Sequence, residues 1–290
     1  MEALRWERRP TLERPLFVVA FEGWNDAGDA ASLAVTYLAQ AWDAERFASI
    51  DPEEFYDFTE TRPQVRMIDG ETRELEWPEV ELLAATIPAG ADGASRDVIL
   101  VRGVEPQLRW RTFCGLLVEV ARSYDAEMAL ILGALLADVP HTRPVRVSGS
   151  ADDAALAARL GLLQSTYEGP TGIVGVLHHA FTEAGIPAAS FWAAVPHYVH
   201  QVPSPKAALA LVERSASLIG ASVNPLELRV AAEEYVRQVS ERVADDDDAA
   251  AYVAQLEEAA DSERDPLELL GDPDRLAEEV ERFLRRHRDG

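Results

Sequence analysis

The sequence is poor in cysteine, in lysine and in long apolar runs. Cys114 is the only cysteine, which excludes an intrachain disulfide, and its place in an apolar predicted helix indicates a buried structural thiol. Lys206 is the only lysine and the arginines are scattered, so no polybasic stripe is available to bind an anionic membrane. No stretch approaches 18 uninterrupted apolar residues, and residues 1–10 lack the apolar core of a signal peptide, so we expect a cytoplasmic protein.

Positive charge is also scarce relative to negative charge. The chain has 27 Lys and Arg against 51 Asp and Glu, which gives a formal net charge of −24. Because a polyanion would meet net repulsion over most of such a surface, nucleic acid is not expected as a partner. Hydrophobic residues make up 48% of the 290 residues and are spread through the sequence, which is typical of a globular protein with a sizeable core.

Short apolar runs alternate with amphipathic or alanine-rich stretches from residue 16 to residue 220. The predicted elements are, in chain order, strand 16–21, helix 30–42, strand 97–101, helix 108–124, strand 128–136, strand 145–148, helix 151–160, helix 173–184, strand 188–194 and helix 205–220. Strands that alternate with helices favour an α/β fold with a mostly parallel sheet covered on both faces.

Two segments depart from this alternation. Residues 64–68 and 71–77 predict two strands around the tight turn Asp69-Gly70, hence a β-hairpin inserted at the sheet edge. From Asn224 onward helix formers dominate, with three helices expected at 226–243, 249–260 and 273–287. We therefore divide the chain into an α/β core of residues 1–222 and an acidic helical subdomain of residues 223–290.

Polar side chains follow several of the predicted strands, where the loops of an open parallel sheet converge and bind ligands. Carboxylates and imidazoles from separate loops could meet there for acid–base chemistry. The catalytic candidates are Asp26, Asp138 and His141, and the candidate ligand-binding residues are Glu22, Asn25, Asp29, Arg143, Tyr167, Thr171 and His197.

Each candidate also has a structural interpretation. Asn25, Asp26 or Asp29 could cap the helix that follows them, an interpretation that we favour over catalysis. Asp138, His141 and Arg143 could form an ion-paired network that holds a proline-bounded loop. His197 and His200 lie three apart, but the prolines around them favour extended chain over a helical metal pair, so no metal is expected. The sequence contains no P-loop, GxGxxG, GxSxG, HExxH or paired CxxC motif, and no cofactor is predicted.

Taken in order, these loops resemble the proteasome assembly chaperone 2 family, particularly its actinobacterial branch. The segments that carry the resemblance, within residues 4–220, are Phe21-Glu-Gly-Trp-Asn-Asp-Ala-Gly-Asp-Ala-Ala-Ser32, Thr61-Arg-Pro-Gln-Val65, Asp138-Val-Pro-His-Thr-Arg-Pro144, Tyr167-Glu-Gly-Pro-Thr-Gly-Ile173, Ser190-Phe-Trp-Ala-Ala-Val-Pro-His-Tyr-Val199 and Pro203-Ser-Pro-Lys-Ala207.

The resemblance implies a core like that of purine nucleoside phosphorylases, self-association and, in archaeal and eukaryotic relatives, a role in assembling proteasome rings. Relatives that dock on those rings can use a C-terminal hydrophobic-tyrosine-any-residue tail, a pattern that residues 286–290 do not show. We therefore predict a non-enzymatic assembly factor or protein-interaction scaffold, with a proteasome-related protein as a possible partner. The alternative is a small-molecule hydrolase or phosphorylase-like enzyme that uses a cleft at the carboxyl ends of the strands.

Overall fold

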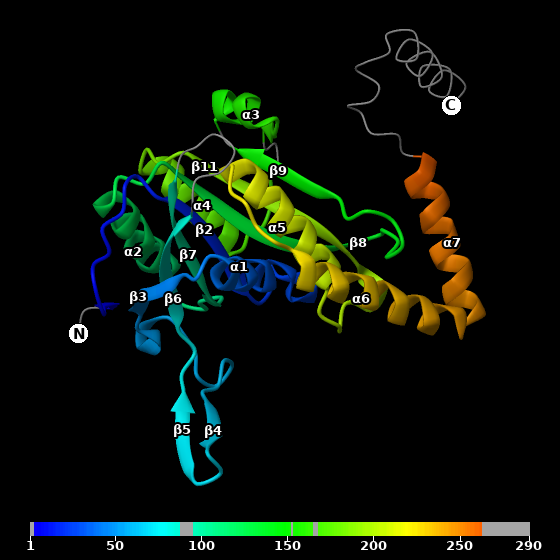
Figure 1. Cartoon of the computed structure of the whole chain (residues 1–290), viewed down its shortest axis with the longest axis horizontal. Helices are drawn as coiled ribbons and strands as arrows, with labels where there is room; N and C mark the ends of the chain where they lie inside the picture. Colours follow the sequence, from blue (N-terminus) through cyan, green and yellow to red (C-terminus); the bar gives the residue numbers. More distant parts are fainter. Residues whose placement is uncertain (1–2, 88–94, 152, 165–167, 263–290) are drawn as a thin grey trace.

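The computed structural model describes residues 3–87, 95–151, 153–164 and 168–262 and contains a nine-stranded sheet flanked by helices (Figure 1). Across the sheet the strands are β1 (Leu4–Trp6), β3 (Glu45–Ile50), β6 (Val80–Ile87), β7 (Arg96–Val104), β2 (Leu16–Glu22), β8 (Met128–Ala137), β11 (Ala188–Pro196), β9 (Val147–Ala151) and β10 (Leu163–Gln164). β7, β2, β8 and β11 run parallel in the centre, and β1, β3 and β6 extend the sheet antiparallel on one side. The predicted α/β class is confirmed.

Helices cover both faces of this sheet. The helices are α1 (Ala30–Ala41), α2 (Trp110–Ser123), α3 (Ala154–Leu160), α4 (Ile173–Glu183), α5 (Pro205–Ile219), α6 (Leu226–Ala244) and α7 (Asp247–Ser262). α1 packs beside α5, and α2 packs beside α4. None of the helices in the described ranges combines the length and hydropathy needed to cross a bilayer.

The continuous apolar run of β2 explains why the core has two halves. Successive side chains of a strand point to opposite faces of the sheet. Leu16 and Val18 therefore enter the cluster under α1 and α5. Phe17 and Val19 enter the cluster under α2 and α4. Cys114 of α2 belongs to the second cluster, where burial raises the pKa of its thiol to about 12, as expected of a structural cysteine.

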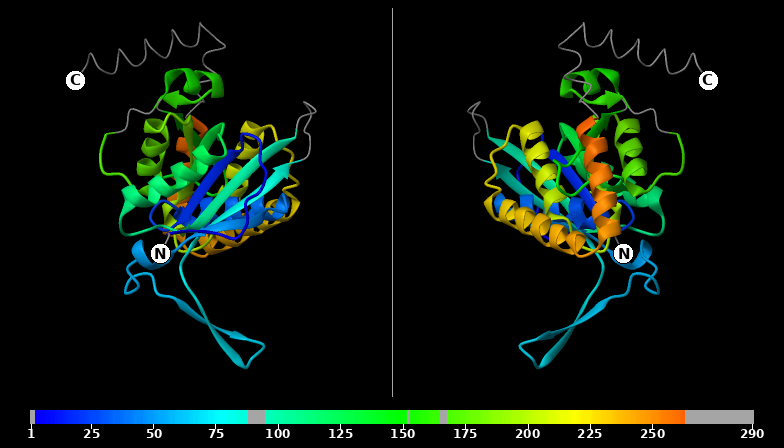
Figure 2. Two further views of the ribbon diagram at one scale, coloured as in Figure 1. Left: turned by 90° about the vertical axis from the view of Figure 1, so that its left-hand side faces the viewer. Right: turned by 90° about the vertical axis from the view of Figure 1, so that its right-hand side faces the viewer.

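The predicted hairpin is present as β4 (Gln64–Ile68) and β5 (Thr72–Glu76), joined by the turn at Asp69 and Gly70. It forms a two-stranded sheet of its own in the connection between β3 and β6, and it extends away from the nine-stranded sheet (Figures 1 and 2). β3 and β6, which flank this insertion, were not predicted from the sequence.

The two described helices of the C-terminal part lie close to the predicted positions. α6 packs on α5 and contributes Leu228 to the core, and α7 folds back from the end of α6. The acidic run 245–248 connects α6 to α7. Within it, the Asp246 carboxylate caps α7 by accepting hydrogen bonds from the amides of Asp248 and Ala249. The third predicted helix, 273–287, lies outside the described residues, and the division at residue 222 stays a prediction.

Candidate functional site

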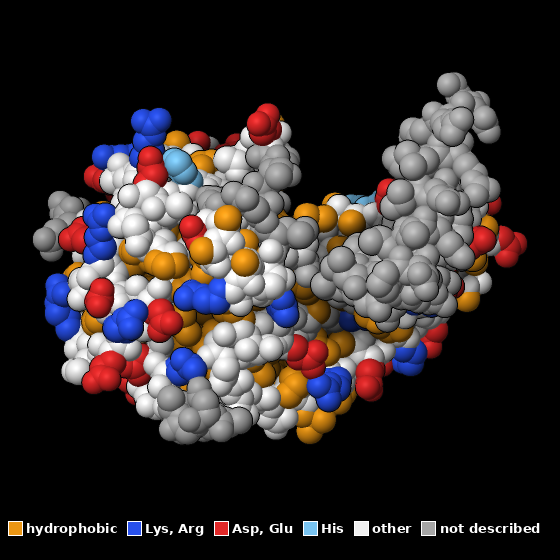
Figure 3. All heavy atoms as spheres, turned by 90° about the horizontal axis from the view of Figure 1, so that it is seen from above, with side chains coloured by type: hydrophobic (Ala, Val, Ile, Leu, Met, Phe, Trp, Pro, Cys, Tyr) orange, Lys and Arg blue, Asp and Glu red, His pale blue; other side chains and the backbone are white. Residues whose placement is uncertain are grey.

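The carboxyl ends of β7, β2, β8 and β11 lie at the same edge of the sheet, because these strands run parallel. The loops that follow them hold most of the candidate residues. The polar contacts at this edge form two groups, one around the loop after β2 and one around the loop after β8. Figure 3 shows the molecule from above, the side opposite to the hairpin, where arginine and carboxylate side chains of the described residues are interspersed with apolar ones.

Asp26, in the loop after β2, caps α1. Its buried carboxylate accepts a hydrogen bond of 2.6 Å from the Ala31 amide and longer ones from the Ser32 amide. Burial raises the pKa of Asp26 to about 6, although the hydrogen bonds to Ser32 and Ala31 oppose that rise. Asp26 thus caps the first turn of α1, which is the structural interpretation that the sequence favoured over catalysis.

The neighbouring candidates have separate surroundings. Asn25 is buried and its amide nitrogen lies 3.4 Å from the carboxylate of Glu105, which also accepts a hydrogen bond from the Trp24 amide at 3.0 Å. Glu22 and Asp29 are exposed, and burial of part of Glu22, together with the negative charge of Asp29, raises the pKa of Glu22.

The loop before α4 holds two more candidates. Thr171 is exposed. Gly172 lies against Asn25, since a Cβ at that position would be 2.4 Å from the Asn25 amide nitrogen. Tyr167 lies outside the described residues.

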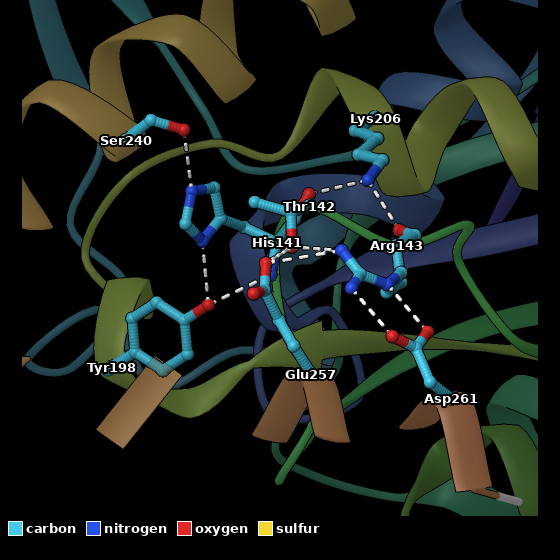
Figure 4. A network of polar contacts seen from close by, with 8 residues as sticks. All are labelled: His141, Thr142, Arg143, Tyr198, Lys206, Ser240, Glu257 and Asp261. Carbon is cyan, nitrogen blue, oxygen red and sulfur yellow. Dashed lines mark hydrogen bonds and ion pairs between the residues drawn. The ribbon is translucent and has the colours of Figure 1, made fainter. Parts of the chain in front are cut away.

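His141, in the loop after β8, is buried in a network that joins the core to α6 (Figure 4). Its Nδ1 atom lies 2.8 Å from the Tyr198 hydroxyl, and its Nε2 atom lies 2.9 Å from the hydroxyl of Ser240 on α6. The Tyr198 hydroxyl also accepts a hydrogen bond from the His141 amide at 2.8 Å. Both ring nitrogens are therefore engaged by the protein itself.

Arg143 joins the same loop to α7. Its guanidinium makes a two-point ion pair with Asp261, with both nitrogen–oxygen distances at 2.8 Å, and contacts Glu257 at 3.2 Å. The Thr142 hydroxyl donates to the same Glu257 carboxylate. A planar guanidinium suits this bidentate geometry, which fixes the orientation of α7 on the loop.

Lys206, at the start of α5, binds the backbone of the loop after β8. Its ammonium group donates to the backbone carbonyls of His141 and Arg143. Burial and the positive charge of Arg143 lower the pKa of Lys206, and burial together with Lys206 lowers the pKa of His141. Partial burial raises the pKa of Tyr198 to about 12, so the network at neutral pH combines a neutral imidazole with a neutral phenol.

Asp138 and His197 pair with each other at the outer side of this network. Asp138 Oδ1 lies 3.0 Å from His197 Nδ1 and 3.3 Å from the hydroxyl of Tyr252 on α7. His200 Nδ1 lies 2.8 Å from the backbone carbonyl of His197. Within the described ranges, no three His, Cys, Asp or Glu side chains come together as a metal ion would require.

The space beside His141 and Lys206 is too small for a substrate, whereas Tyr198 and Tyr252 also line an open groove of about 600 Å³ that reaches α6 and α7. The cavity lined by His141, Arg143, Lys206 and Tyr235, among others, has a volume of about 10 Å³. A cavity of this size holds about one water molecule. Ser204 connects the two polar groups, because its amide donates to the Gly28 carbonyl at 2.7 Å and its side chain lines the same small cavity.

The structure thus brings Asp138, His141, Arg143 and His197 into contact with α6 and α7, and keeps Asp26 in the cap of α1. Sequence analysis missed Ser240, Glu257 and Asp261, which complete the network. Glu257 and Asp261 are four residues apart on α7 and so share one face of that helix, which is the only sequence signal that they carry.

Residues 20–243 match the model of the PAC2 family. The chain belongs to the PAC2 family. It is 48% identical to a PAC2 family protein of Streptomyces avermitilis. The match to the crystal structure of that protein has a TM-score of 0.76 and covers 82% of this chain and 99% of the Streptomyces chain. It is 50% identical to a proteasome-assembly chaperone homologue of Mycobacterium tuberculosis, with a TM-score of 0.74 and the same coverage.

More distant structures share the fold alone. An archaeal proteasome activator of Pyrococcus furiosus is 17% identical, with a TM-score of 0.66 over 82% of this chain and 97% of its own. No curated protein sequence matches the chain. The family resemblance stated from the sequence is confirmed.

Proposed function

We propose that this chain is a non-enzymatic assembly factor or protein-interaction scaffold that engages a proteasome-related protein and associates with itself. The observation that carries the proposal is membership of the PAC2 family, with 50% identity over 82% of the chain to a proteasome-assembly chaperone homologue. The proposal includes a cytoplasmic location.

The polar groups at the strand ends support a structural role. Asp26 caps α1, both ring nitrogens of His141 are engaged, and Asp138 pairs with His197. A general base or acid needs room for a substrate within hydrogen-bond reach, whereas the cavity beside His141 measures about 10 Å³. Nothing in the described residues favours the enzyme alternative.

The test is affinity capture with the full chain as bait in a native lysate of its own organism, followed by mass spectrometry. We expect recovery of a proteasome-related protein in stoichiometric amount. Because the net charge of −24 attracts basic proteins without specificity, an unrelated protein of similar size and charge serves as the control bait. Recovery of no stoichiometric partner beyond the control would count against the proposal.

A further inference from the structure

An open groove lies at the corner where α6 ends and α7 begins. It has a volume of about 600 Å³ and is bounded on its other side by residues 198–202, which follow β11. Five valines line it: Val199, Val202, Val239, Val243 and Val253. Because most of this lining is apolar, the groove is suited to an apolar occupant. We call it the corner groove.

The polar network of the loop after β8 holds both sides of the corner groove in place. Tyr198, on one side, has its hydroxyl 2.8 Å from His141 Nδ1, and the other ring nitrogen of His141 lies 2.9 Å from Ser240 on α6 (Figure 4). Tyr252, on the α7 side, has its hydroxyl 3.3 Å from Asp138 Oδ1. The groove is therefore formed by the fold itself, which lowers the cost of binding an occupant.

Negative charge lies at the rim of the corner groove. Asp246 lines the groove, and all four carboxylates of the acidic run 245–248 are exposed. Among the described residues, no arginine or lysine forms an ion pair with any of these four. An occupant that combines an apolar face with adjacent positive charge would complement both features of the groove.

The C-terminal segment of this chain has that combination. Residues 282–288 read Arg-Phe-Leu-Arg-Arg-His-Arg, with four arginines and no carboxylate, in a chain whose net charge is −24. The helix predicted at 273–287 has apolar residues at positions i, i+4, i+7 and i+8: Leu276, Val280, Phe283 and Leu284. This is the spacing of a helix that binds in a groove. Since an isolated helix of 15 residues is marginal in water, its apolar stripe favours a surface that covers it.

The lengths of the segments allow this stripe to reach the corner groove. α7 has 16 residues and is about 24 Å long, and a helix over residues 273–287 would be about 22 Å long. The ten residues 263–272 between them could span up to about 33 Å, more than the 8–10 Å between the axes of packed helices. A helix that returns along α7 runs antiparallel to it, which brings the basic end at 282–288 beside the acidic run 245–248.

We propose that residues 276–288 bind in the corner groove of their own chain, as a helix antiparallel to α7. Val280, Phe283 and Leu284 pack on the valines of the groove, and the arginines beside them pair with the acidic run 245–248. The same segment of a second copy would have the same chemistry, but a connection of ten residues raises the effective concentration of the chain's own segment to about the millimolar range. This contact goes beyond the proposed function and does not depend on it.

Disulfide trapping in the full chain tests the contact. Gln201 is exposed and lines the corner groove, so Gln201→Cys should retain the fold. We expect Gln201→Cys with Leu284→Cys to form a disulfide within one chain under oxidised glutathione, at least tenfold faster than Gln201→Cys with Arg285→Cys. Arg285 is the matched control because it lies next to Leu284 in sequence but away from the apolar stripe. Cys114 is buried and does not compete.

Charge reversal tests the pairing of the arginines with the acidic run. Arg286→Glu with Arg288→Glu, added to the pair Gln201→Cys and Leu284→Cys, should slow disulfide formation at least fivefold. Asp245→Arg with Asp248→Arg in the same chain should restore the rate, and both positions are exposed. Asp246 stays unchanged in this experiment because it caps α7. A rate that does not fall, or that is not restored, would overturn the charge pairing on which the proposal depends.

Hydrogen exchange followed by mass spectrometry tests coverage of the groove without added thiols. Val280→Ser with Leu284→Ser should raise the exchange rate of the amides of residues 199–202 at least threefold, because the occupant is weakened. The matched control is Val230→Ser with Leu226→Ser on α6, since these residues have the same types and spacing and are 58% and 61% exposed. The control should leave the exchange of residues 199–202 unchanged.

The remaining outcomes also decide the proposal. Disulfide-linked dimers in place of the closed monomer would overturn it in favour of the segment of a second copy. Equal rates for the Leu284→Cys and Arg285→Cys pairs would mean that the apolar stripe does not face the groove, which also overturns it. Unchanged exchange of residues 199–202 in the Val280→Ser and Leu284→Ser variant would mean that the groove is open to another ligand, and the proposal fails.

Discussion

The burial of Asp26 makes the stability of the fold depend on pH. Its carboxylate is buried and has a pKa of about 6, compared with 3.8 for a free aspartate. The folded protein therefore binds a proton more tightly than the unfolded chain between about pH 4 and pH 6. Ionisation of Asp26 consequently lowers the free energy of unfolding as the pH rises through this range, and the full rise in pKa corresponds to about 3 kcal/mol.

Asp26→Asn tests this reasoning, because the amide oxygen can still accept from the backbone amides of Ala31 and Ser32 but cannot ionise. We expect the free energy of unfolding of Asp26→Asn, relative to wild type, to rise by about 2.4 kcal/mol from pH 4 to pH 7, because part of the full difference of about 3 kcal/mol is already present at pH 4. Guanidinium denaturation at four pH values gives this difference, and the subtraction removes the titration of the other carboxylates. Asp26→Ala should show the same pH dependence and be less stable than Asp26→Asn by about 1 kcal/mol at each pH, because the cap is lost.

A difference between Asp26→Asn and wild type that does not change with pH would refute the argument. It would mean that the hydrogen bonds from Ala31 and Ser32 compensate for the burial of the charge. A change of opposite sign would mean that the ionised carboxylate stabilises the fold at neutral pH.

Three other substitutions test the network and the base of the hairpin. His141→Ala leaves the Tyr198 and Ser240 hydroxyls without their partner, and denaturation at pH 8 should show a loss of about 2 kcal/mol. Because the folded-state pKa of His141 is lowered, this loss should shrink as the pH falls below 6.5. Arg143→Met removes the ion pair with Asp261, so hydrogen exchange followed by mass spectrometry should show faster exchange in α7 and an unchanged core; equal exchange in α7 would contradict the role of that pair. Gly103→Ala places a Cβ 2.3 Å from the Glu79 carbonyl at a φ of +154°, so thermal unfolding should show a loss of about 2 kcal/mol or more.

The central strands could be predicted from the sequence because each is a run of apolar residues buried on both faces, as in β2 and β8. β6 was missed because Val80-Glu-Leu-Leu-Ala-Ala-Thr-Ile87 is rich in leucine and alanine, which do not favour strands locally. β3 was missed because Glu45-Arg-Phe-Ala-Ser-Ile50 mixes two charged residues and a serine with three apolar residues and so shows no continuous apolar run. Both strands are defined by pairing with distant partners, which short-range periodicity does not reveal.

The same limit applies to the site. The loop of residues 138–143 was identified correctly as a place where polar groups gather. Its partners on α6 and α7 lie far away in the sequence, since His141 and Ser240 are separated by 99 residues and Arg143 and Asp261 by 118. No local pattern specifies such contacts, so the choice between a catalytic cleft and an ion-paired network could only be left open.

α7 binds the polar groups of the loop after β8 and so determines which groups of that loop are available to a ligand. In a parallel sheet these loops bind small ligands when their polar groups point into a cleft. Here the polar groups of the loop after β8 instead bond to α6 and α7, and burial lowers the pKa of His141, which keeps its imidazole neutral. Four large apolar side chains are exposed at this edge, Trp24, Leu108, Leu135 and Leu136, beside the exposed carboxylates of Glu22 and Asp29. An edge whose polar groups hold its own helices and whose apolar groups face solvent is suited to binding protein surfaces.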